Sequence, residues 1–474
     1  MKHIIAFALA VGLAGCAQFD PDTGMRQVQT TVAARSGQNV AWQRDAQSRA
    51  DAMQLTANLL QKPIGVDDAA RLALLNNANL QADFAELGVA EAEAVQSSLL
   101  RNPFLQIGVQ TPRGPGSNAL DLGISWDVLG LFTLPLRQDA AEQAKNIARL
   151  QAAKRALALA ANTRAAWYSY LNELETVDLQ QDMHEANDLI AEIARRLDAA
   201  GNQAGLTRAN AEAAALASRF ALEDSKARTQ IAHSRLLGLL GLTDKIVATS
   251  PPIFPDSLPR LPEADPTAPS RDELETQHLD IALLKAELAR AEKLAASARR
   301  STWTDSLELG WNWSRESSQT SGGEWKDGPS LGIGLPLFDT GAAHRTAAGF
   351  EVERLRAALT ARRDSLQREA RLAEHRMQQA RARVETLRDK LLPLLSNAED
   401  VALLEYNAMQ RSTAQLLELK QRELEAIRQL VQGLGDYWQA RTALEALRLG
   451  VNLNLPASGP AANPGAPART DGGH

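Results

Sequence analysis

Two stretches of the chain alternate apolar and polar residues with a period of two, which is the pattern of β-strands with one apolar face. Between Ser306 and Leu337, the runs SLELGWNWS and SLGIGLPL flank a polar loop. Two further runs of this kind lie within residues 105–128. We therefore predict two β-hairpins, at about 102–130 and 305–338. The apolar face of their strands includes Leu122, Ile124, Trp126, Leu309, Trp311, Trp313, Leu331 and Ile333.

The rest of the chain has helical sequence, in an order that occurs twice. Each half reads as helix, hairpin, long helix, break and helix. Arg137 and Arg345, which follow the two hairpins, are 208 residues apart, and so are Gly201 and Met409 at the two helix breaks. Each arm from hairpin to break is therefore 64 residues long, from 137 to 201 and from 345 to 409. This equality indicates a structural duplication.

These patterns predict six segments. Residues 17–40 are expected to be weakly structured, and 41–61 to contain a short helix. Residues 249–270 are rich in proline, so we expect a connector without a regular helix. The segments are a signal peptide (1–15), an N-terminal lipidated extension (16–61), a first repeat (62–248, with its tip at about 201–205), the connector (249–270), a second repeat (271–455, with its tip at about 408–413) and a disordered tail (456–474).

The N-terminal sequence MKHIIAFALAVGLAGC has a lysine, an apolar run and small residues at its end, as a secretory signal does. Its end, Leu13-Ala14-Gly15-Cys16, resembles the bacterial lipobox, which implies cleavage before Cys16 and lipid such as palmitate on its thiol. Cys16 is the sole cysteine, so no disulfide forms within the chain. The residue after it is Ala17, which by resemblance to sorting rules favours the outer membrane. The alternative is a chance cysteine in an ordinary signal peptide.

Composition argues against several other classes of protein. The net charge of −6 gives no basic surface for nucleic acid. The sequence has no P-loop, no dinucleotide-binding GxGxxG after a strand and no HExxH motif, and its histidines are scattered. We therefore predict no enzyme activity, no cofactor and no metal site. Glu399, Asp400 and Glu405 lie near the second break, where a threefold acidic ring could filter cations; a solvated helix face is the alternative.

Closure of the sheet constrains the assembly. In lipid, an open sheet edge leaves backbone groups without partners. Four strands are too few to close, since bacterial barrels begin at about eight. If the strands span a membrane, two copies would give eight strands with a filled interior, and three would give twelve with room for a conduit. Tryptophans in the strands suit an aromatic girdle. The alternative is a small soluble β-layer packed on helices.

Several short motifs add to the duplication. They are Asn76-Asn77, Arg101-Asn102-Pro103, Leu335-Pro336-Leu337-Phe338-Asp339, Gly201, Tyr406 and Leu416-Leu417-Glu418-Leu419. With this order and spacing, residues 60–450 resemble the TolC family of outer-membrane efflux channels, specifically a lipoprotein member. The chain departs from the family at Met409, where a glycine often stands three residues after the tip tyrosine, Tyr406.

The resemblance implies a mainly α-helical homotrimer with a small membrane β part, in which a twelve-stranded β-barrel continues as a periplasmic α-helical barrel. It implies an efflux duct in the outer membrane of a Gram-negative bacterium, gated at the helix tips. Its partners would be a periplasmic adaptor, an inner-membrane RND-type pump and outer-membrane lipid. The sequence leaves metal and drug cargo both open, and a periplasmic coiled-coil lipoprotein without a pore is the rival interpretation. The tip residues are Gly201, Asn202, Gln203, Met409, Gln410 and Ser412.

Overall fold

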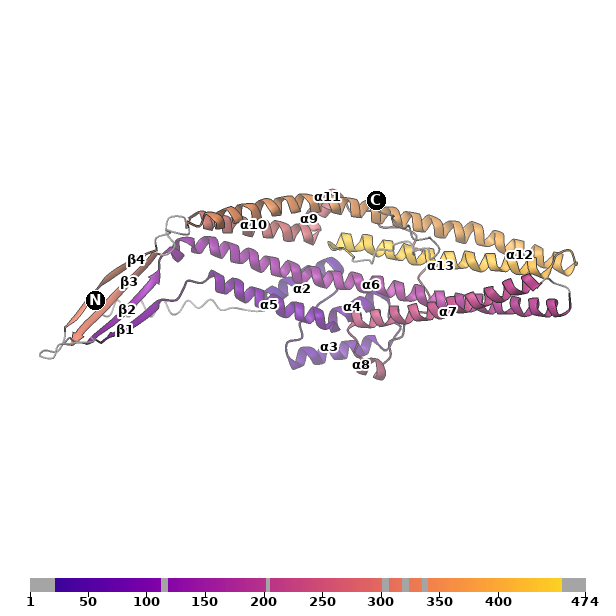
Figure 1. Ribbon diagram of the computed structural model, residues 1–474, viewed down its shortest axis with the longest axis horizontal. Coiled ribbons are helices and arrows are strands. Elements are labelled where there is room, and N and C mark those ends of the chain that lie inside the picture. Colours follow the sequence, from indigo (N-terminus) through magenta and orange to yellow (C-terminus); the bar gives the residue numbers. More distant parts are fainter. Residues whose placement is uncertain are drawn as a thin grey trace, which may run out of the picture. The chain divides into compact units, whose positions relative to one another are not determined.

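The computed structural model (Figure 1) describes residues 22–111, 118–201, 205–300, 307–317, 324–334 and 340–453. The chain divides into two compact units. The first consists of Met1–Leu55, Asn77–Leu157 and Pro269–Glu369. The second consists of Thr56–Asn76, Ala158–Ala268 and Ala370–His474. Each unit takes residues from both sequence repeats, so the repeats are not independent globular domains.

The two predicted hairpins are confirmed as strands, and they form one sheet in the first unit. Its strand order is β1-β2-β3-β4, and all neighbours are antiparallel. The strands β2 and β3 pair although they are distant in sequence, so the hairpins join side by side and β1 and β4 form the two edges. The strands are β1 (Phe104–Gln110), β2 (Asn118–Asp127), β3 (Leu307–Ser317) and β4 (Trp325–Ile333).

Helices make up most of the remaining structure, in the duplicated order that the sequence predicts (Figure 1). The helices are α2 (Asp22–Ser36), α3 (Ala46–Leu59), α4 (Val66–Asn76), α5 (Ala78–Ser98), α6 (Leu129–Ala199), α7 (Gly205–Leu240), α8 (Asp244–Thr249), α9 (Arg271–Gln277), α10 (Leu279–Arg300), α11 (Ala342–Thr386), the π-helix η1 (Leu387–Leu391), α12 (Leu392–Asn407) and α13 (Thr413–Leu449).

The prediction of weak structure at residues 17–40 is wrong for α2 (Asp22–Ser36), which is a regular helix; residues 17–21 lie outside the described residues. Met25, Val28 and Val32 are buried at helical spacing along one side of it. Gly24 lies so close to α5 that a Cβ there would stand 2.1 Å from the carboxylate of Glu91. A narrow contact of small and apolar residues therefore holds the helix in place. Because the sequence of α2 is mostly polar, these few residues do not stand out in it.

The sequence pattern predicts one helix from about Val66 to Pro103 and another from about Arg137 to Ala200, and the structure differs from both predictions. The helix expected from Val66 to about Pro103 is interrupted at Asn77, whose side chain accepts a hydrogen bond from the backbone N–H of Leu80 (3.1 Å) and so begins α5. The helix expected from about Arg137 begins at Leu129 instead. Asp127 stabilises this earlier start, because its carboxylate accepts a hydrogen bond from the backbone N–H of Gly130 (3.0 Å).

The long arm of the second repeat contains the π-helix η1, in which the N–H of Leu392 bonds to the carbonyl of Leu387, five residues back. Pro393 follows immediately. In a regular helix the proline ring would clash with the carbonyl of the residue four positions earlier, Asp389. A wider π turn relieves this clash, so Pro393 gives a physical reason for η1.

In the second unit, the proline-rich connector has no regular helix over most of its length, as predicted, but it is firmly anchored. The Asp265 carboxylate accepts a hydrogen bond from the Tyr437 hydroxyl (2.6 Å) and pairs with Arg381 (2.8 Å). The Trp438 indole N–H donates to the carbonyl of Pro259 (3.0 Å). These bonds hold the connector against α11 and α13.

The Tyr437–Asp265 hydrogen bond predicts a sensitivity to alkaline pH. Burial, together with that bond, raises the pKa of Tyr437 to about 12, against about 10 in an unfolded chain. Between these pH values the unfolded chain releases a proton that the folded chain retains, so stability falls as pH rises. Tyr437→Phe should reduce this fall by up to about 1.4 kcal/mol per pH unit, measured by urea unfolding. Burial also raises the pKa of Tyr168, so some alkaline destabilisation should remain; an unchanged slope would contradict the assignment.

Candidate functional site

The sheet has one apolar face that runs across all four strands. In its register, Ile124 lies opposite Leu105 on one side and Trp311 on the other. Trp126 lies opposite Leu309, which in turn faces Leu331. All eight strand residues predicted to share a face do so. Leu309 is 50% exposed and Leu331 63%, so the chain itself leaves this face largely uncovered.

The other face of the sheet is polar and contains glycine. Asn312 lies opposite Gly123 on β2 and Gly328 on β4. A Cβ at Gly123 would stand 2.6 Å from the Asn312 side-chain oxygen, so the amide needs the space that glycine leaves. The Ser125 hydroxyl donates to the Glu308 carboxylate (3.4 Å). One face thus suits lipid and the other water.

The turns between α6 and α7 and between α12 and α13 lie at the same end of the second unit (Figure 1). Gly201 has a left-handed backbone with φ 72°. Met409, its counterpart in the duplication, has φ 59° and is the one non-glycine residue with positive φ in the described part of the chain. The departure from glycine at this position therefore leaves the left-handed turn intact. Asn202 and Gln203 lie outside the described residues.

The second turn is closed by local hydrogen bonds. The N–H of Gln410 donates to the carbonyl of Glu405 (2.8 Å). Ser412 begins α13 with a capping box, since its hydroxyl accepts from the N–H of Gln415 and its own N–H donates to the Gln415 side chain. Met409 protrudes from this turn and is 95% exposed.

The left-handed backbone at Met409 predicts a gain in stability on substitution by glycine. The left-handed conformation costs a non-glycine residue about 1–2 kcal/mol. Glycine avoids this cost, but its greater freedom in the unfolded chain offsets part of the gain. Met409→Gly should therefore raise stability by up to about 1 kcal/mol, measured by thermal unfolding. Met409→Ala is the control, because it removes the thioether but keeps the strain. An equal gain in both variants would show that the side chain is responsible.

The three predicted acidic residues differ in their surroundings. Glu399 lies 3.3 Å from Lys420 of α13, which also pairs with Glu423; we call these three residues the Lys420 cluster. Burial and the neighbouring Glu423 raise the pKa of Glu399, whereas the hydrogen bond from Lys420 lowers the pKa of Glu423. Glu405 pairs with Arg411 (2.7 Å). Asp400 is exposed, and the role of the three acids as a cation filter stays a prediction.

The sequence did not reveal the Lys420 cluster. Glu399 and Lys420 are 21 residues apart and lie on different helices, so no spacing rule connects them. The pair Lys420 and Glu423, three residues apart on one helix, was the only local signal. The cluster joins α12 to α13 close to the tip. If α12 moves, these contacts must therefore break, or α13 must move with it.

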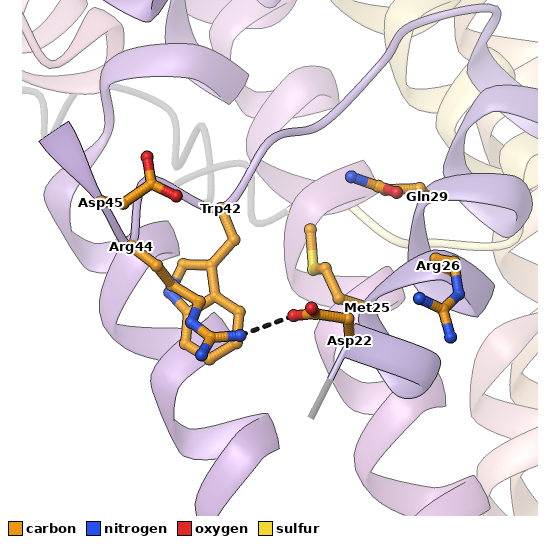
Figure 2. A pocket seen from close by; sticks show the side chains of 7 residues that line it. All are labelled: Asp22, Met25, Arg26, Gln29, Trp42, Arg44 and Asp45. Carbon is orange, nitrogen blue, oxygen red and sulfur yellow. Dashed lines mark hydrogen bonds and ion pairs between the residues drawn. The ribbon is translucent and has the colours of Figure 1, made fainter. Parts of the chain in front are cut away.

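A pocket of about 510 Å³ lies in the first unit, between α2 and residues 42–45 (Figure 2). Two of its charged lining residues already pair with each other. The guanidinium of Arg44 pairs with Asp22 (2.5 Å) and lies 4.9 Å from the centre of the Trp42 ring. This arrangement does not bring together a nucleophile with a base or an acid–base pair.

Other features of the sequence prediction bear on the site. Among the described residues, no group of three or more histidine, cysteine or carboxylate side chains could hold a metal ion. None of the helices in the described part of the chain is both long and apolar enough to cross a membrane. Cys16 lies outside the described residues, so its lipidation stays a prediction.

Known proteins share this architecture. A membrane protein from Pseudomonas aeruginosa superimposes with a TM-score of 0.65 and 19% identity, covering 86% of this chain and 95% of its own. The CmeC outer membrane channel of Campylobacter jejuni gives a TM-score of 0.67 and 16% identity, covering 82% and 87%. The chain has the fold of the TolC-family outer-membrane efflux channels. No protein-family profile matches it.

A curated protein is also similar along most of the TolC-fold chain. It is the cobalt-zinc-cadmium resistance protein CzcC of Cupriavidus metallidurans, with 24% identity over 391 residues, which is 81% of this chain and 90% of CzcC. The likeness extends over nearly the full length of that relative. The expected mainly helical fold with a small antiparallel sheet is confirmed, whereas the trimer and its two barrels stay predictions.

Proposed function

We propose that three copies of this chain form an efflux duct in the outer membrane of a Gram-negative bacterium. The observation that supports this most strongly is the four-stranded sheet with one exposed apolar face and two free edges. Each unpaired strand edge costs several kcal/mol per backbone group in lipid. Three sheets joined edge to edge give twelve strands and remove every edge, which leaves an interior wide enough for a conduit.

The polar face of the sheet would line the barrel, and the long helices would continue the duct into the periplasm as an α-helical barrel. We infer that lipid on Cys16 adds an anchor. The helix tips would meet a periplasmic adaptor that links the duct to an inner-membrane pump of the RND type. The function is passage and gating, so no catalytic residue is needed. The rival spacer lipoprotein gives no reason for an uncovered apolar sheet face.

The similarity to CzcC makes cobalt, zinc and cadmium ions the first cargo to test. Deletion of the gene should raise cellular accumulation of these ions, and the intact gene should restore export. In planar lipid bilayers, the purified protein should give discrete conductance steps. A photo-crosslinker at Gln410 should capture the adaptor in cells. Absence of any conductance from the assembled protein would refute the duct.

A further inference from the structure

The helix α6 begins where β2 leaves the sheet, and its first two turns expose apolar side chains. Val128 still bonds to the sheet, because its N–H donates to the carbonyl of Leu307 (2.7 Å). In the helix that follows, Leu131 is 49% exposed and Phe132 66%. Pro135, about one turn further on, is exposed as well. The exposed surface therefore stays apolar as the chain passes from strand to helix.

The same side of α6 becomes polar immediately afterwards. At 100° per residue, Gln138 lies about 20° from Leu131 around the helix axis, and Glu142 lies about 20° from it on the other side. Both polar residues are exposed. Ala140, which lies half a turn round from Leu131, is buried against the protein. One exposed stripe of α6 therefore changes from apolar to polar between Pro135 and Gln138.

The level of this change agrees with the thickness of a membrane. The apolar residues of β2 run from Leu120 to Val128, and Arg315 on β3 lies opposite Leu120 at the end of the apolar face away from the helices. Eight residues span about 26 Å along a strand, which is about 20 Å along the membrane normal at a tilt of about 40°. The apolar band of bacterial barrels is about 25 Å tall. The strand is therefore short by about 5 Å, and α6 as far as Pro135 adds up to about 10 Å.

Pro135 limits how deep this segment can lie in a membrane. A proline has no N–H, so the carbonyl of Leu131 lacks its usual helical partner four residues further on. In hydrocarbon such a group is costly, because nothing there replaces the lost hydrogen bond. At the boundary of the membrane, water and lipid headgroups can supply that bond. The first two turns of α6 therefore fit the layer between acyl chains and headgroups.

We propose that residues 129–135 of α6 lie in the inner leaflet of the outer membrane, with Leu131 and Phe132 among the acyl chains close to the headgroups. The inference rests on the duct proposed above and places the periplasmic border of its lipid contact on a helix. A seam with a neighbouring subunit is the other way to cover these side chains. A seam gives no reason for the stripe to become polar after two turns, whereas a leaflet of limited apolar depth does.

Brominated phospholipids test this contact in the full-length protein, because bromine quenches a fluorophore that it touches. The variant Leu131→Cys is labelled with a bimane dye and reconstituted into vesicles of phosphatidylcholine that is brominated on the acyl chain close to the headgroup. Gln138→Cys is the matched control, since it lies on the same side of α6. Because the two positions are about 10 Å apart, bromination should reduce the fluorescence at least about threefold more at position 131 than at 138. The wild-type protein, in which Cys16 is the sole cysteine, gives the background labelling.

A third label separates failure of this inference from failure of the duct. Trp126→Cys, on the apolar face of β2, should be quenched as strongly as the label at position 131. Quenching at 126 without quenching at 131, or equal quenching at 131 and 138, would overturn the helix contact and leave the duct standing. Absence of quenching at 126 would contradict the shared barrel and this inference with it. If Leu131→Cys does not reach the membrane, Phe132→Cys and Asp139→Cys replace the matched pair, because they are also seven residues apart on one side of α6.

Discussion

Leu309→Arg should prevent assembly of the proposed trimeric channel in the outer membrane, whereas the Asn312→Arg variant should assemble. The two residues are three positions apart on β3 and lie on opposite faces of the sheet. Arginine on the lipid face costs about 2–4 kcal/mol at the bilayer midplane, and a trimer pays this three times. On the polar face the same charge would lie in water and would alter conductance at most.

Both variants are assayed by extracting the outer membrane and separating the complexes on native gels. The amount of Leu309→Arg trimer should fall by at least tenfold, while that of Asn312→Arg should stay close to the wild type. Equal tolerance of arginine at the two positions would show that the apolar face does not contact lipid. This result would contradict the proposal of a shared barrel.

Glu91→Ala should strongly destabilise the first unit. Glu91 is 2% exposed, and its carboxylate accepts a hydrogen bond from the Arg149 guanidinium (2.6 Å). The truncation leaves the largely buried Arg149 guanidinium with only the more distant Glu142 carboxylate (3.8 Å), so we expect a loss toward the lower end of the about 3–5 kcal/mol that breaking a buried pair costs. It also removes the side chain against which Gly24 of α2 packs. We expect a large fall in unfolding temperature and faster proteolysis of α2.

Asp83→Ala is the matched control. Asp83 pairs with Arg155 (2.5 Å) between the same two helices, α5 and α6, but the Arg155 side chain is 42% exposed. Surface pairs contribute about 0–1 kcal/mol, so this variant should unfold close to the wild type. An equal fall in unfolding temperature in the two variants would mean that burial does not increase the contribution of the Glu91–Arg149 pair to stability.

The strands and the tips could be predicted because each depends on a local or repeated pattern. Alternation with a period of two assigned Leu309 and Asn312 to opposite faces, and the paired strands confirm that assignment. The equal arm lengths placed Gly201 and Met409 at corresponding turns, where both have left-handed backbones. Strand pairing between β2 and β3 needs contacts across more than 180 residues, so the sequence gives no direct sign of it.

What the sequence did not reveal depends on contacts between distant segments. The helix α2 is stabilised where Gly24 approaches Glu91, and a single glycine in a polar stretch gives no hint of this. The Lys420 cluster needs α12 and α13 to be side by side. For α2 and this cluster the residue types were visible in the sequence, and their partners were not. The π-helix η1 is a local exception, because Pro393 alone gives a reason for it.

Native mass spectrometry of the wild-type protein in mild detergent is the most direct test of the shared barrel. The four-stranded sheet of the described residues has two edges, and only an assembly can remove them in lipid. We predict a single dominant species with the mass of three chains, which dissociates only when the protein unfolds. A folded monomer that keeps its β-sheet signal, or a dimer as the stable species, would contradict the twelve-stranded duct.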